Sequence, residues 1–153
     1  MGTRSPITPW IPVLAWMFVI FGLGSASFEH EQTSRFIGPL LRWLFPDHSP
    51  GTLADLHDAI RKLAHVVEYA VQGLLVARAL AHSAPAASWR RLALPTLALV
   101  AAVAALDENR QSGLEQRTGS ARDVLLDLFG GALGFGLAPW IVHRPAAEER
   151  ADE

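Results

Sequence analysis

The chain has 153 residues, a length that suits a single domain. Half of the residues are hydrophobic, 18% are charged, and the mean hydropathy is +0.22, values that are high for a soluble domain of this size. A net charge of -2 without a basic block argues against nucleic-acid binding, and the absence of cysteine excludes disulfides, thiolate nucleophiles and cysteine-ligated zinc.

The first apolar stretch covers residues 10–27 and contains no charged residue, so it predicts a membrane-spanning helix. A cleaved signal peptide is the alternative, because Arg4 precedes the stretch and the small residues Gly24, Ser25 and Ala26 lie near its end. The two prolines before the apolar run, and the apolar segments later in the chain, favour a helix that is retained.

Residues 28–58 form a predicted polar connection. Within it, residues 33–45 combine large apolar and basic side chains, as in a short helix that lies in the membrane interface. These side chains are Phe36, Leu40, Trp43 and Leu44, together with Arg35 and Arg42. A loop folded over the helical bundle is the alternative interpretation.

Three further apolar stretches cover residues 56–80, 92–106 and 124–142. The middle one is shorter than the roughly 20 residues that a bilayer requires, so flanking residues 88–91 and 107–111 are expected to complete it. Gly130 and Gly134 have a spacing that permits close helix approach, and their face could also support a homo-oligomer. The sequence therefore predicts an all-α fold, a four-span transmembrane helical bundle with a short interfacial helix in the first long loop.

A soluble helical bundle is the competing fold. Its helices would carry polar residues at regular helical spacing along their whole length. Residues 92–106 contain Thr96 as their single polar side chain, and the first stretch has no charge at all. Both stretches favour a membrane protein.

The predicted orientation depends on the cations that lack acidic neighbours in the sequence. Arg90 and Arg91 lie in a short predicted loop, and arginines in such loops stay on the cytoplasmic side. Both termini are then cytoplasmic, and the polar residues at the opposite ends of the spans face outside. Residues 1–144 form the predicted transmembrane domain, and residues 145–153 form a disordered cytoplasmic tail.

Three polar clusters lie at the start of the second apolar stretch, the end of the third and the start of the fourth. Because successive spans alternate in direction, all three clusters fall at the same face of the membrane. An ionisable group costs about 2.5–3.5 kcal/mol at mid-helix, so such groups usually pair and mark a site. The candidate ligand-binding residues are Lys62, His65, Glu68, Tyr69, Asp107, Glu108, Gln111, Arg117, Ser120, Asp123 and Asp127.

Two roles for these clusters require no chemistry. In the first, basic residues pair with acids and only fix the helix packing. The basic residues are Lys62, Arg117 and Arg122, and the acids are Glu68, Asp107, Glu108 and Asp123. In the second, Lys62 and Arg117 bind the phosphate or carboxylate of a lipid head group from the outer leaflet.

A third role is catalytic. His65 would act as a general base oriented by Glu68 or Asp107, and Glu108 is a further catalytic candidate. A divalent metal held by His65 and nearby carboxylates, including Asp123, is a further alternative. However, the H-x-x-E order occurs once, and the chain has no H-E-x-x-H, G-x-S-x-G or P-loop motif. The sequence therefore requires no cofactor, and no residue is assigned as a metal ligand.

Four short motifs follow one another along the chain: KLAHVVEY at 62–69, DENRQ at 107–111, RTGSARDV at 117–124 and GGxxG at 130–134. Over about residues 10–140, this order resembles the VanZ-like family of small bacterial membrane proteins. The founding member of that family is associated with low-level resistance to the glycopeptide teicoplanin. The resemblance implies a protein of the bacterial inner membrane that acts at its outer face, on or near lipid-linked cell-wall precursors, with an effect on glycopeptide susceptibility.

Asp127 departs from the pattern of that family, which usually carries asparagine four residues after the acid matched by Asp123. The additional acid would either tighten the pairing with Arg117 or Arg122 or change the ligand. Teicoplanin resistance itself does not transfer to this chain on a resemblance alone.

Overall fold

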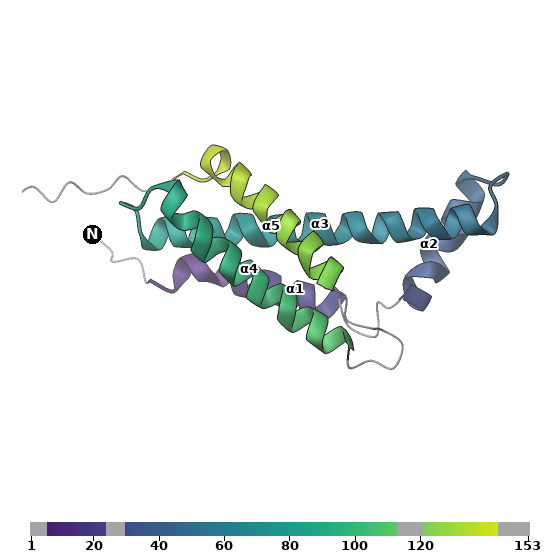
Figure 1. Cartoon of the computed structure of the whole chain (residues 1–153), viewed down its shortest axis with the longest axis horizontal. Coiled ribbons are helices and arrows are strands. Elements are labelled where there is room, and N and C mark those ends of the chain that lie inside the picture. The colour runs from purple at the N-terminus through teal and green to yellow at the C-terminus, as the bar shows by residue number, and fades with distance from the viewer. Residues whose placement is uncertain (1–5, 24–29, 113–120, 144–153) are drawn as a thin grey trace, which may run out of the picture.

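A computed structural model describes residues 6–23, 30–112 and 121–143. Within these ranges every element is helical, which confirms the all-α prediction (Figure 1). In chain order the elements are η1 (Thr8–Trp10), α1 (Ile11–Leu23), α2 (His30–Leu44), α3 (Pro50–Ser83), α4 (Trp89–Ser112) and α5 (Ala121–Ile141). The predicted tail at 145–153 lies outside the described residues.

Three of the helices are long and apolar enough to cross a membrane, over Pro50–Ser83, Trp89–Arg110 and Arg122–Ile141. The N-terminal apolar helix, Thr8–Gly22, is shorter. At 1.5 Å per residue it rises about 22 Å, less than the roughly 30 Å of a hydrocarbon core. By length alone, the described residues therefore contain three spans where the sequence predicted four.

The outward surface of these helices is strongly apolar. Phe18, Leu94 and Trp140 are each more than three-quarters exposed, at 79%, 78% and 86%. Many other large apolar side chains on α1, α3, α4 and α5 are at least a third exposed. Soluble proteins rarely expose so much apolar surface, so this surface fits contact with lipid.

Helix α3 begins at Pro50, earlier than the sequence predicted. Ser49 caps it, because its Oγ accepts a hydrogen bond from the Thr52 backbone N–H at 3.2 Å, and Pro50 occupies the first turn. Residues 50–58, predicted to belong to a connection, are therefore helical. The 34-residue helix is about 51 Å long, more than a hydrocarbon core requires.

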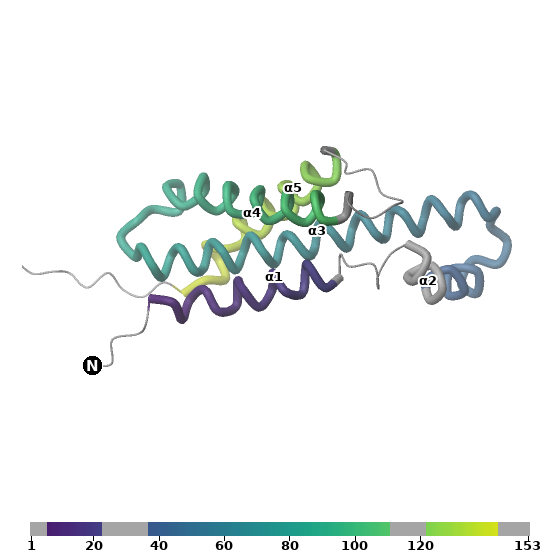
Figure 2. Tube along the Cα trace, turned by 90° about the horizontal axis from the view of Figure 1, so that it is seen from below, coloured from purple at the N-terminus to yellow at the C-terminus, as the bar shows by residue number. Residues whose placement is uncertain are grey.

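The other helices are arranged around α3. Figure 1 shows the N-terminal part of α3 extending beyond α1, α4 and α5, with α2 folded back against it. Figure 2 shows α1 on one side of α3 and α4 on the other. The predicted helix at 33–45 is thus present as α2, although its side chains at 30–36 lie outside the described residues. Where the rest of α2 is described, Leu40, Trp43 and Leu44 are exposed.

Helices α3 and α5 approach closely because their facing residues are glycines. A Cβ added at Gly130 would collide with the backbone of Val66, and one at Gly134 would collide with the backbone of Ala70. Both contacts advance in the same direction along the two helices, so α3 and α5 are parallel. The glycine spacing therefore packs these helices within one chain, and a second copy could not use this face without displacing α3.

This packing predicts a difference between two glycines of α5. We expect Gly134→Ala to lower the free energy of unfolding by about 1–3 kcal/mol, because backbone atoms of α3 cannot make room for a methyl group. Gly136→Ala is the matched control, since a Cβ at Gly136 meets no atom within 4 Å. Circular dichroism during denaturant unfolding in detergent measures both. Equal stability of the two variants would contradict this account of the packing.

Candidate functional site

A buried pair of ionisable side chains connects α3 to α5. The Nδ1 atom of His65 lies 3.2 Å from Oδ1 of Asp127, and the two side chains are 19% and 3% exposed. Asp127 precedes Gly130 by three residues, so the close packing of α3 and α5 also brings the carboxylate to the imidazole. The sequence offered pairing with Arg117 or Arg122 as one of two roles for Asp127; in the structure His65 contacts Asp127, and Arg117 lies outside the described residues.

Further polar side chains continue from His65 along α3 toward the interior. Tyr69 and Gln72 are completely buried, and Glu68 is half-buried. Among the described residues, the Tyr69 hydroxyl, both polar atoms of the Gln72 amide and Oε1 of Glu68 have no hydrogen-bond partner. Buried polar groups in native proteins nearly always have a partner, so these atoms indicate a place for water or a ligand.

Helix α4 contributes the second cluster. Asp107 is 3% exposed and Glu108 is half-buried. Asp107 is an electrostatic neighbour of Glu68, and Glu108 is an electrostatic neighbour of Asp127. The carboxylate of Asp123 is another neighbour of Asp127. The structure therefore brings together residues of all three predicted clusters.

Two hydrogen bonds connect α1 to the helices that carry the site. The Trp16 indole N–H donates a hydrogen bond to the backbone carbonyl of Glu68 at 3.0 Å. Near the C-terminal end of α4, the Arg110 guanidinium donates to the Phe21 carbonyl at 3.0 Å and lies 4.9 Å from the centre of the Phe21 ring. Another nitrogen of the same guanidinium lies 3.8 Å from Asp107. Arg110 thus connects α1 to the acidic end of α4.

Trp16, Gln72 and Arg110 are absent from the residues that the sequence selected for the site. Gln72 follows His65 and Glu68 at helical spacing, and Arg110 belongs to the DENRQ segment. The sequence pattern therefore pointed to both residues as part of the site. No sequence pattern pointed to Trp16, because an aromatic residue in an apolar stretch is expected to face lipid or the core.

Some predicted site residues lie elsewhere or are not described. The Lys62 Nζ atom lies 2.8 Å from Asp58, and its side chain is 54% exposed. Its partner is therefore one turn away on α3, in place of the four acids that the sequence proposed. Arg117 and Ser120 lie outside the described residues, as does the side chain of Gln111.

The described part of the site combines acidic side chains with neutral side chains that can form hydrogen bonds. Its fully buried side chains include the two carboxylates of Asp107 and Asp127, the Tyr69 phenol and the Gln72 amide. Among the described residues, no three His, Asp or Glu side chains come together in a way that could hold a metal ion. The arrangement offers hydrogen-bond donors and acceptors to a polar group, and a carboxylate that orients an imidazole.

The fold and the site define an all-helical membrane protein with a polar site buried among its spans. Residues 10–142 match the VanZ/LLP1 family, and since this match covers most of the chain, the protein belongs to that family. No curated protein and no solved structure matches the chain.

The His65–Asp127 contact predicts strong energetic coupling between the two residues. We expect a double-mutant cycle with His65→Ala and Asp127→Ala to give a coupling free energy of about 1–3 kcal/mol, because either single change leaves a buried partner unsatisfied. The exposed Asp58–Lys62 pair is the matched control, and should give about 0.2–1 kcal/mol. Unfolding in detergent provides all values. A buried pair no more strongly coupled than the exposed pair would contradict the contact.

Proposed function

We propose that this protein spans the membrane of the bacterial cell envelope four times and binds the head group of an anionic lipid or lipid-linked cell-wall precursor. The observation that carries the proposal is the set of buried hydrogen-bonding atoms on Glu68, Tyr69 and Gln72 that lack partners among the described residues. They lie beside the His65–Asp127 pair, within a bundle whose outer surface suits lipid. A polar head group would satisfy them, and the attached chains would lie among apolar side chains.

The anionic part of the ligand requires a cation near these groups. Lys62 is held by Asp58 on the exposed side of α3, so it is the weaker candidate. Arg117 belongs to the residues that directly precede α5, and a guanidinium suits bidentate recognition of phosphate or carboxylate. We therefore assign the anion to Arg117 and the uncharged part of the head group to Tyr69 and Gln72.

Contacts at both ends of the N-terminal helical segment, formed by η1 and α1, support the fourth span. The Trp10 indole N–H donates to Ser83, the last residue of α3, at 3.3 Å. At the other end, the Phe21 carbonyl accepts from Arg110 near the end of α4. Because α3 and α4 end at opposite faces of the bundle, these two contacts favour a segment that extends from one face toward the other despite its shorter length.

The charges of the connection between α3 and α4 support the proposed orientation. Only five residues, 84–88, separate the two helices, and Arg90 and Arg91 lie in the first turn of α4. Such arginines favour the cytoplasmic side. The proposal therefore has both termini inside, residues 145–153 as a cytoplasmic tail after a membrane domain at 1–144, and the polar site open to the outside.

The natural absence of cysteine makes this orientation directly testable. We expect a membrane-impermeant maleimide to label Asp47→Cys in intact cells and to label Ser88→Cys only after the membrane is permeabilised. Both residues are exposed. The unmodified chain is the control, because it has no thiol to react. The reverse labelling pattern would contradict the orientation, and labelling of both in intact cells would contradict the number of spans between them.

Binding of the head group predicts the effect of a single hydroxyl. We expect Tyr69→Phe to weaken binding of the co-purified lipid by about two- to tenfold, the range for loss of one hydrogen bond. Thr96→Val is the matched control, since the Thr96 hydroxyl is equally buried but bonds the Leu92 carbonyl within α4. Native mass spectrometry of gently extracted protein measures the bound lipid. In the same measurement, Arg117→Ala should release it. Unchanged lipid in both site variants would remove the basis of the proposal.

An intramembrane enzyme that acts on the same class of molecule is the second candidate. It is favoured by the hydrogen bond between His65 and Asp127, because a carboxylate that orients an imidazole is a common arrangement for a general base. The two functions differ in one result. With an enzyme, a folded His65→Gln variant would retain bound lipid and lose its conversion, whereas with a binding protein the bound lipid would be chemically the same in both.

A further inference from the structure

A pocket lies where α5 ends beside α3, at the end of α5 that is remote from the His65–Asp127 pair. Its volume is about 340 Å³, within the range of sites that hold small ligands. Its walls include the apolar side chains of Leu74, Leu75 and Val142, and its polar side chains are Arg78, His82 and His143. No acidic side chain is among the described residues that line it. The pocket therefore combines basic groups with walls that suit hydrocarbon.

The guanidinium of Arg78 has no hydrogen bond or ion pair with the described residues, although the side chain is half-buried. A cation near the end of a helix usually bonds the last carbonyls. Here, carbonyls near the end of α3 have other donors. The Nδ1 atom of His82 lies 2.8 Å from the Arg78 carbonyl oxygen, and the Ser83 hydroxyl donates to the Ala79 carbonyl at 2.9 Å. The Arg78 guanidinium is therefore available to a ligand.

Three tryptophans indicate that this end of the bundle lies at a membrane interface, where tryptophan is enriched. Trp10 bonds Ser83 at the end of α3, Trp89 is the first residue of α4, and Trp140 is the next-to-last residue of α5. The pocket is thus at the level of the lipid head groups. The proposed orientation makes this the cytoplasmic leaflet, because the connection between α3 and α4 lies at the same end.

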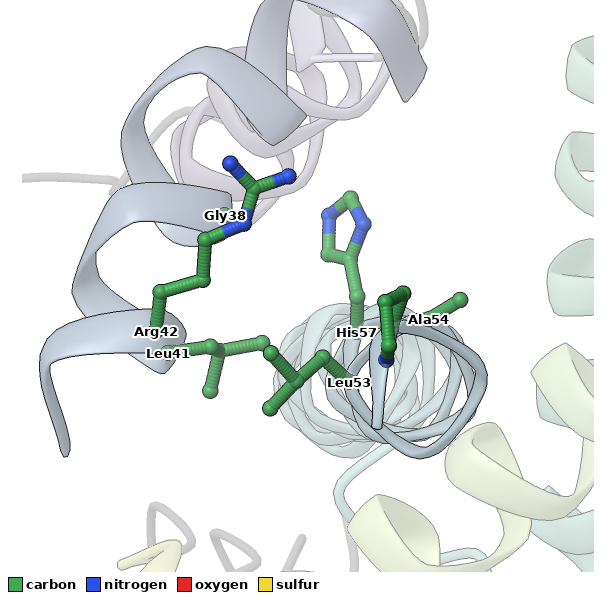
Figure 3. A pocket seen from close by; sticks show the side chains of 7 residues that line it. Gly38, Leu41, Arg42, Leu53, Ala54 and His57 are labelled. Carbon is green, nitrogen blue, oxygen red and sulfur yellow. The ribbon is translucent and has the colours of Figure 1, made fainter. Parts of the chain in front are cut away.

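A pocket at the other end of α3 has different polar groups. It lies between α2 and the start of α3, has a volume of about 240 Å³, and is lined by residues that include Arg42 and His57 (Figure 3). His57 already has an interaction partner, and Arg42 is exposed. Arg42 is therefore a matched control for Arg78, since it also lines a pocket beside α3 but without the half-buried position.

We propose that the pocket at Arg78 binds the phosphate of an anionic phospholipid from the cytoplasmic leaflet. The guanidinium offers two parallel N–H donors to phosphate oxygens. His82 donates through Nε2 when its ring carries both protons, the form that a neighbouring phosphate favours. Basic pockets between membrane helices at the cytoplasmic side are typical sites for such head groups. The acyl chains would lie against the apolar walls at Leu74 and Leu75.

This site is separate from the polar site of the proposed function. Arg78 lies thirteen residues after His65 on the same helix, or about 20 Å along its axis. The two sites open toward opposite ends of the bundle. The phosphate site therefore does not depend on what the polar site binds; only the name of its leaflet rests on the proposed orientation.

The test uses native mass spectrometry of the purified full-length protein in detergent. Dioleoyl phosphatidic acid is titrated beside dioleoylglycerol, which has the same chains without the phosphate. We expect phosphatidic acid to bind preferentially and Arg78→Gln to weaken one of its binding events about tenfold, as for loss of a hydrogen bond to a charged group. Arg78→Lys should retain part of the affinity, because it keeps the charge without the bidentate geometry. Arg42→Gln should bind as the unmodified protein does.

Arg117→Ala separates the two lipid sites, since it should weaken a different binding event and its effect should add to that of Arg78→Gln. A loss in Arg78→Gln alone would support the phosphate site and contradict the proposed function, whereas a loss in Arg117→Ala alone would do the reverse. An equal loss in Arg42→Gln, or equal binding of dioleoylglycerol, would overturn the phosphate site. Displacement of the lipid by excess inorganic phosphate would overturn its assignment to a phospholipid.

Discussion

The close approach of α3 and α5 is the contact on which the rest of the structure depends. Glycines on α5 allow its backbone to lie against that of α3 at Val66 and Ala70. Lipid chains are as apolar as leucine, so helices in a membrane gain little from hydrophobic burial against each other and depend on packing. The same approach carries Asp127 to His65, so the fold and the polar site are consequences of one contact.

The polar site illustrates how a membrane protein manages buried charge. The groups are not distributed along all the helices; they lie at the matching ends of α4 and α5 and in the adjacent part of α3. His65 offsets one carboxylate and Arg110 approaches another, while Trp16 and Arg110 tie α1 to the same region. An uncompensated charge in such surroundings would cost several kcal/mol, so this concentration of polar groups is retained at a real energetic cost. That cost is the physical reason to seek a function there.

The sequence predicted the all-α fold and the meeting of the three clusters because both depend only on the lengths and alternating directions of apolar segments. It could not give the pairing of side chains, which depends on how each helix is rotated: Lys62 lies beside Asp58 on the outside of α3, and Asp127 meets His65. The start of α3 was missed because residues 50–58 are not apolar, although Ser49 and Pro50 are a typical helix start. The contacts of Trp16 had no counterpart in the sequence pattern.

The uninterrupted course of α3 has a geometric consequence. His57, at the corner with α2, and His65, beside α5, belong to one helix and are separated by eight residues, or about 12 Å along its axis. Because the helix is continuous, it holds the two histidines at a fixed distance from each other. The corner with α2 can therefore move relative to His65 only if α3 bends or tilts.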